Sequence, residues 1–141
     1  MKLYRTLDKL STCLRYKATY YELKYYLKEV MNGKRNTYLK YISKCDRGIG
    51  KSVALARLSA KYNIPVIVPT CSWKDIIEKD IPEIVPKYFK HKKPIAIPEK
   101  TLLPDMRFKV ILVEEGLSRD AIMDLANNYS CYKVVGFKSI Y

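Results

Sequence analysis

The sequence is poor in several residues that mark specialised protein classes. Its 141 residues include one histidine, one tryptophan and four cysteines, and the cysteines form no CxxC pair. A disulfide framework or zinc site is therefore not predicted, and we expect reduced thiols. No uninterrupted apolar run approaches the roughly 18 residues that a membrane span needs. Asp8 precedes any apolar block, so we expect no secretory signal, no membrane segment and a cytoplasmic protein.

Positive charge is abundant and unevenly placed. The chain carries 27 Lys and Arg against 14 Asp and Glu, a net charge of +13. Residues 1–44 hold 11 basic and 3 acidic residues, and eight of the 13 tyrosines occur by Tyr41. Such a field attracts polyanions: nucleic acid, nucleotide or an acidic protein surface. The alternative is a solvated lysine-rich surface that only keeps the protein soluble.

The N-terminal segment has helical periodicity. Steps of three and four residues connect an apolar stripe of Leu3, Leu7, Leu10, Leu14, Ala18, Tyr21 and Tyr25. Asn32-Gly33 predicts the end of a helix over residues 3–31. We favour a helix that packs this stripe on the domain. The alternative is a basic arm that binds single-stranded nucleic acid through its lysines and Tyr16, Tyr20, Tyr21, Tyr25 and Tyr26.

From residue 37 on, strand and helix patterns alternate. Strands are predicted at 37–43, 64–70, 95–97, 107–113 and 133–137. Helices are predicted at 51–62 and 118–129, with two short ones within 72–90, the first ending near Pro82. Such alternation predicts an α/β fold, with a parallel sheet and helices on both faces. We expect a core at 37–141 and a helical extension at 1–36.

The segment Cys45-x4-Gly50-Lys51-Ser52 lies between a predicted strand and a predicted helix. A glycine-containing turn lets backbone N–H groups point at phosphates, and the helix adds its positive end. A lysine placed here reaches the phosphates and a hydroxyl coordinates Mg²⁺. Further on, the strand at 107–113 ends in Glu114-Glu115. Carboxylates at a strand tip beside such a loop can hold Mg²⁺ and orient an attacking water.

Together these segments resemble the Walker A and Walker B motifs of the P-loop NTPase superfamily, with a RecA- or AAA-like core. Cys45 stands where the family usually has Gly, and Glu114 where it usually has Asp. The resemblance implies that ATP is held by Arg47, Gly48, Ile49, Gly50, Lys51, Ser52 and Val53. It implies Mg²⁺ ligation by Ser52 and Glu114, and catalytic roles for Lys51 and Glu115.

The resemblance predicts a minimal, lidless ATPase, slow or stimulated by a partner, that acts in a nucleic-acid-related process. In general style, the chain is similar to small P-loop proteins of bacteriophages and mobile elements. A homo-oligomer or protein partner is expected to assist, with Arg107 and Arg119 as alternatives for an arginine acting in trans. The rival hypothesis is a degenerate P-loop fold that binds a protein or nucleic acid without hydrolysing ATP.

Three other residues have a structural and a functional interpretation. Ser139 follows the last predicted strand, where additional-strand P-loop ATPases place a polar residue that senses the γ-phosphate, but we favour a solvated terminal serine. Trp73 is predicted to be a core residue and not a base-stacking platform. His91, within Lys90-His91-Lys92-Lys93, is predicted to be a solvated loop residue.

Overall fold

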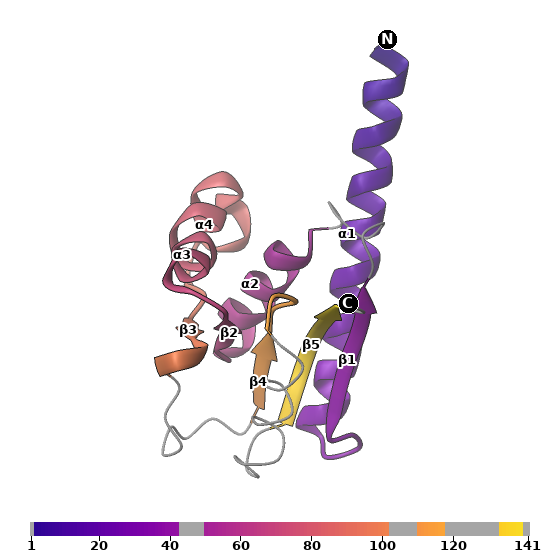
Figure 1. The fold of residues 1–141 in the computed structure, drawn as a ribbon. Helices are drawn as coiled ribbons and strands as arrows, with labels where there is room; N and C mark the ends of the chain where they lie inside the picture. The colour runs from indigo at the N-terminus through magenta and orange to yellow at the C-terminus, as the bar shows by residue number, and fades with distance from the viewer. Residues whose placement is uncertain (1, 43–49, 102–109, 118–132, 140–141) are drawn as a thin grey trace.

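The computed structural model describes residues 2–42, 50–101, 110–117 and 133–139, with the backbone alone for 2–13 and 139. Five strands form one parallel sheet in the order β1-β5-β4-β2-β3 (Figure 1). They are β1 (Thr37–Ile42), β2 (Val66–Val68), β3 (Ala96–Pro98), β4 (Val110–Val113) and β5 (Lys133–Ser139). Each lies within or overlaps a predicted strand, so the α/β class and the parallel sheet are confirmed.

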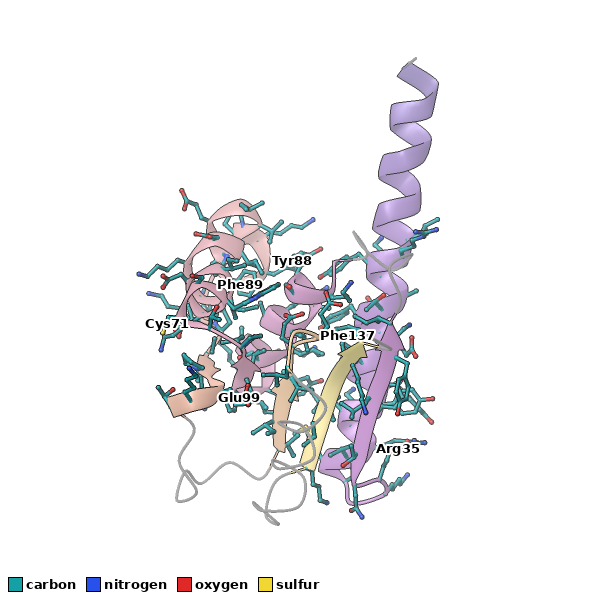
Figure 2. All side chains as sticks on the ribbon, in the orientation of Figure 1. Arg35, Cys71, Tyr88, Phe89, Glu99 and Phe137 are labelled. Atoms are coloured by element: carbon teal, nitrogen blue, oxygen red, sulfur yellow. The ribbon has the colours of Figure 1, made fainter. Side chains whose placement is uncertain are left out.

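The described helices cover one face of this sheet. They include α1 (Lys2–Met31) and α2 (Lys51–Tyr62), which contact one another. The strand residues facing them share a register: Val66 lies beside Leu112, and Leu112 beside Val135. All three join the helices in the main hydrophobic core, in which Phe137 is also fully buried (Figure 2).

The other face of the sheet has buried apolar residues of its own. Ile67, Ile111, Val113 and Val134 alternate with the residues of the main core and form a second cluster with Leu117. The predicted helix at 118–129 lies outside the described residues. Helices on both faces of the sheet therefore stay a prediction.

The buried stripe of α1 differs from the predicted one. Leu14, Tyr21 and Tyr25 are 67%, 58% and 59% exposed, and Ala18 is exposed as well. The buried hydrophobic residues are instead Tyr20, Leu23, Leu27 and Val30. Both sets have helical spacing, so periodicity alone did not identify the face that meets the sheet. The N-terminal turns of α1 extend beyond the sheet (Figure 1), so the leucines there were a poor guide to the packed face.

Polar contacts fix the second half of α1 to the first strand. The Glu22 carboxylate accepts hydrogen bonds from the Tyr38 hydroxyl at 2.5 Å and from Lys40 Nζ at 2.6 Å. The ring of Tyr26 stacks on that of Tyr38, with centroids 3.8 Å apart. Together with the buried Leu27, these contacts pack this half of the helix on the domain, through residues other than the predicted stripe. Asn32-Gly33 follows its end as predicted, and Gly33 has a positive φ of 77°.

The segment after β2 is helical through Pro82, so the predicted helix end there is wrong. It consists of α3 (Cys71–Asp75), the π-helical η2 (Ile76–Asp80) and α4 (Ile81–Ile84). Pro82 is the second residue of α4, within this continuous helical segment, and it has no N–H to donate to the preceding turn. The wider π turn directly before α4 lets the helical segment continue through the proline. Single 3-10 turns follow at η3 (Pro86–Tyr88) and η4 (Glu99–Thr101), and Trp73 packs against the main core as predicted.

Candidate functional site

The site predicted from the sequence lies where α2 begins beside the carboxyl end of β4. Ser52, in the first turn of α2, donates a hydrogen bond from Oγ to Glu114 Oε2 at 3.1 Å. Lys51 Nζ lies 3.5 Å from Glu115 Oε1. The fold therefore brings together four predicted site residues from two segments that are far apart in the sequence.

Gly50 sets the direction in which α2 begins. It is the N-cap residue, with φ 74° and ψ 31°, a left-handed conformation that glycine adopts without strain. Its carbonyl accepts the first helical hydrogen bond, from Ala54 N at 2.9 Å. A Cβ at this position would lie 2.8 Å from Cδ2 of Tyr16 in α1. Both the backbone angle and the neighbouring ring therefore require glycine here.

Glu114 is the most unusual ionisable group of the site. Its side chain has no exposed surface, and burial raises its pKa to about 7. The backbone N–H of Glu115, which donates to Oε1 at 3.3 Å, and the Ser52 hydroxyl favour the charged form but do not offset burial. A cation beside this carboxylate would favour its ionised form. Glu114 is thus a strong candidate ligand for a positive ion.

Lys51 and Glu115 form an ion pair whose two side chains differ in exposure. Lys51 is only 8% exposed, whereas the Glu115 side chain is 35% exposed. The lysine therefore holds its charge at the N-terminal end of α2, where the helix dipole also favours anions. A phosphate placed there would meet both the ammonium group and the free N–H groups of the first helical turn.

The oxygen donors fit a cation that is shared with a ligand. Ser52 Oγ and the Glu114 carboxylate offer hard oxygen atoms at one point. No group of three or more His, Cys, Asp or Glu that could hold a metal ion occurs in the part of the chain that the structure describes. Mg²⁺ typically takes one or two protein ligands and completes its shell with phosphate oxygens and water. The donor set therefore fits Mg²⁺ bound together with a phosphate ligand.

Several predicted residues are not placed at the site. Arg47, Gly48 and Ile49, together with Cys45, lie outside the described residues, as do Arg107 and Arg119. The side chain of Val53 packs against the main core, so only its backbone can face a phosphate. The backbone of Ser139 pairs with Ile42 at the end of β5, at the same edge of the sheet.

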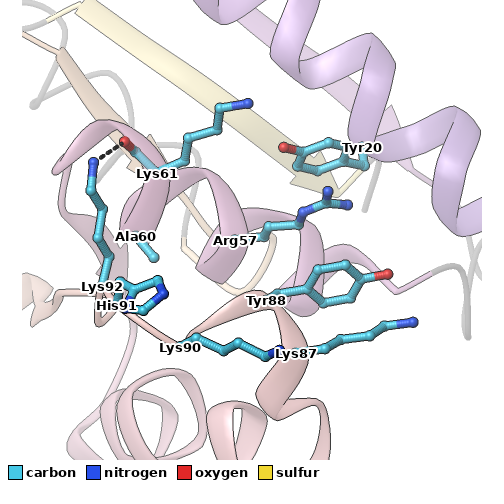
Figure 3. Close-up of a pocket in the computed structure, with 9 residues that line it drawn as sticks. All are labelled: Tyr20, Arg57, Ala60, Lys61, Lys87, Tyr88, Lys90, His91 and Lys92. Atoms are coloured by element: carbon cyan, nitrogen blue, oxygen red, sulfur yellow. Dashed lines mark hydrogen bonds between the residues drawn. The ribbon is translucent and has the colours of Figure 1, made fainter.

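Sequence reasoning missed the contact of Tyr16 with Gly50 and a second cluster of polar residues. Tyr16 covers Gly50 although 34 positions separate them, and no local pattern indicates that contact. A pocket of about 400 Å³ lies between α1, α2 and the residues around η3 (Figure 3). His91 lines this pocket while remaining exposed, in agreement with its predicted solvation. The lysines near His91 were the one signal in the sequence that could have indicated the pocket.

In the described part of the chain, no helix combines the length and the apolar character that crossing a membrane demands. Comparisons of the chain with protein-family models, curated proteins and solved structures found no match.

Proposed function

We propose that this chain is a P-loop protein that binds ATP with Mg²⁺ where α2 meets the end of β4. The observation that carries the proposal is the 3.1 Å contact between Ser52 and the buried Glu114, directly after a left-handed Gly50. In this proposal the first turn of α2 and Lys51 hold the phosphates. Ser52 and Glu114 hold Mg²⁺.

The sheet order supports the same proposal. β5 lies between β1, which leads to the loop, and β4, which carries the carboxylates. Ser139 at the end of β5 then lies on the edge where the γ-phosphate would be sensed.

For catalysis, we propose that Glu115 orients the attacking water in a slow or partner-stimulated ATPase that acts in a nucleic-acid-related process. Its side chain is 35% exposed, and its backbone N–H donates to the Glu114 carboxylate. The rival function is a non-hydrolysing binding module. The observation that favours the rival is the Lys51–Glu115 pair at 3.5 Å, because this ion pair occupies the carboxylate that would orient the water.

Calorimetric titration with ATP and Mg²⁺ tests the binding proposal. Lys51→Ala should abolish binding, whereas Lys79→Ala, a matched change at a lysine that is 77% exposed, should leave it intact. Glu115→Gln should retain binding and lose hydrolysis by about 10²–10⁴-fold. A wild-type protein that does not bind Mg²⁺-ATP would refute the proposal. Binding without turnover, even with nucleic acid added, would favour the binding module.

A further inference from the structure

The pocket near η3 concentrates positive charge away from the proposed ATP site. Its cationic lining residues are Arg57, Lys61, Lys87, Lys90 and Lys92, and none of its lining residues is acidic (Figure 3). Arg57 and Lys61 lie in the second half of α2, whereas Lys51 and Ser52 begin that helix. The two sites therefore share one helix but use different parts of it. A volume of about 400 Å³ suits a ligand of nucleotide size.

Arg57 is held in place by aromatic rings and not by a carboxylate. Its guanidinium lies 3.9 Å from the ring centroid of Tyr20 and 4.1 Å from that of Tyr88, between the two rings (Figure 3). Nη1 donates to the Tyr16 hydroxyl at 3.4 Å. Among the described residues, no carboxylate forms an ion pair with Arg57. The guanidinium thus has a fixed position and a charge that no described carboxylate neutralises.

The inner wall of the pocket contains an unpaired hydroxyl. Tyr20 is 1% exposed, and its Oη is buried without a hydrogen-bond partner among the described residues. Buried polar groups are almost always paired, so this hydroxyl indicates a partner that binds in the pocket. Oη lies on the side of the ring that faces Lys61 (Figure 3). A ligand oxygen there would accept from the hydroxyl and interact with the cations nearby.

Lys61 and Lys92, two lysines of the pocket, each have a defined neighbour. Contact with the Lys24 ammonium lowers the pKa of Lys61. Lys92 Nζ donates to the carbonyl of Lys61 at 3.3 Å. An anion beside Lys61 would offset its repulsion from Lys24. The cluster therefore favours a ligand with concentrated negative charge.

We propose that this pocket binds a backbone phosphate of single-stranded nucleic acid. A phosphate presents several acceptor oxygens, which match the Arg57 guanidinium, the Tyr20 hydroxyl and the lysines. The exposed rings of Tyr21 and Tyr25 continue along α1 from Tyr20, and the Tyr20 and Tyr21 ring centroids are 5.3 Å apart. Such rings provide stacking surfaces for unpaired bases. This site is separate from the ATP site and does not depend on it.

Fluorescence anisotropy with a labelled oligothymidylate at about 50 mM salt tests this proposal. Affinity should fall with salt, with a log–log slope of about −0.7 for each phosphate contacted. Tyr20→Phe removes only the unpaired hydroxyl and should weaken binding about three- to tenfold without lowering the melting temperature. Arg57→Gln should weaken binding at least about tenfold. Two controls should bind the oligothymidylate with wild-type affinity. They are Lys79→Ala, at an exposed lysine, and Lys51→Ala, at the proposed ATP site.

Competitors separate the possible sources of negative charge. A methylphosphonate oligonucleotide, which lacks backbone charge, should not compete, whereas an unmodified strand should. Competition by AMP or inorganic phosphate at matched phosphate concentration would overturn the assignment to a nucleic-acid strand. Equal competition by polyglutamate would overturn phosphate recognition altogether. Wild-type affinity in both Tyr20→Phe and Lys90→Ala would also refute the site, even if Arg57→Gln failed to fold.

Discussion

Replacing Glu114 by Gln should stabilise the protein at neutral and alkaline pH. The buried carboxyl has a pKa of about 7, against an ordinary value of 4.5, because burial disfavours its charge. Below about pH 4.5 it is protonated in both the folded and unfolded states. As the pH rises from 4.5 through about 7, the unfolded state loses this proton first. The free energy of unfolding therefore falls across this range.

The expected magnitude follows from the two pKa values. They differ by about 2.5, and each pKa unit corresponds to 1.36 kcal/mol, so the charged carboxylate costs about 3 kcal/mol above pH 7. Gln has nearly the shape of the protonated acid and remains uncharged. Its carbonyl can accept from the N–H of Glu115, and its amide can donate to Ser52 Oγ. The free energy of unfolding of the variant should therefore match that of wild type near pH 4.5 and exceed it by about 3 kcal/mol at pH 8.

Urea unfolding at several pH values between 4.5 and 8, without nucleotide, measures this difference directly. Other titrating groups act equally in both proteins, so they cancel in the comparison. A difference that stays constant between pH 5 and 8 would refute the account of Glu114 as a costly buried charge. Saturating Mg²⁺-ATP should stabilise wild type by about 2.7 kcal/mol at 100 times its Kd and the variant by much less.

Three further predictions concern residues around the site and in the core. Ser52→Ala should leave ATP binding measurable but remove its dependence on Mg²⁺, as calorimetry with and without the metal would show. Gly50→Ala should lower the free energy of unfolding by about 1–2 kcal/mol, because the backbone at this position is left-handed. Contact of the new Cβ with the Tyr16 ring adds a second contribution. In a urea double-mutant cycle with Tyr16→Ala, only that second contribution should be recovered. Leu27→Ala should cost about 2–5 kcal/mol in urea unfolding, because Leu27 is fully buried between α1 and the sheet.

The strands and the grouping of Lys51, Ser52, Glu114 and Glu115 were predictable because their signals are local. The run Val66-Ile67-Val68 is buried on both faces of the sheet, and such strands have continuous apolar sequences. Gly50-Lys51-Ser52 and Glu114-Glu115 are short motifs whose roles follow from residue type. The two motifs lie close together because each follows a parallel strand, and parallel strands end at the same edge of the sheet. Strand patterns before each motif were enough to predict that arrangement.

The packed face of α1 was not predictable in the same way. Tyr20 and Tyr21 are neighbours of the same type, yet one is 1% and the other 58% exposed. The difference arises from what α1 meets in space, namely α2 and the sheet. Likewise, the cationic pocket joins Arg57 to lysines some 30 positions later, and composition indicates only that charge is abundant. Contacts between distant segments determine both features.

Tyr16 shows why the N-terminal helix is more than a charged extension. Its ring covers Gly50 at the start of α2, and its hydroxyl accepts from Arg57 in the cationic pocket. Leu23 and Leu27 of the same helix are fully buried in the main core. Deleting residues 1–30 would therefore remove part of the core together with any nucleic-acid contacts, and lost binding would have two explanations. Tyr20→Phe changes one hydroxyl and leaves the packing intact, so it can separate recognition from stability.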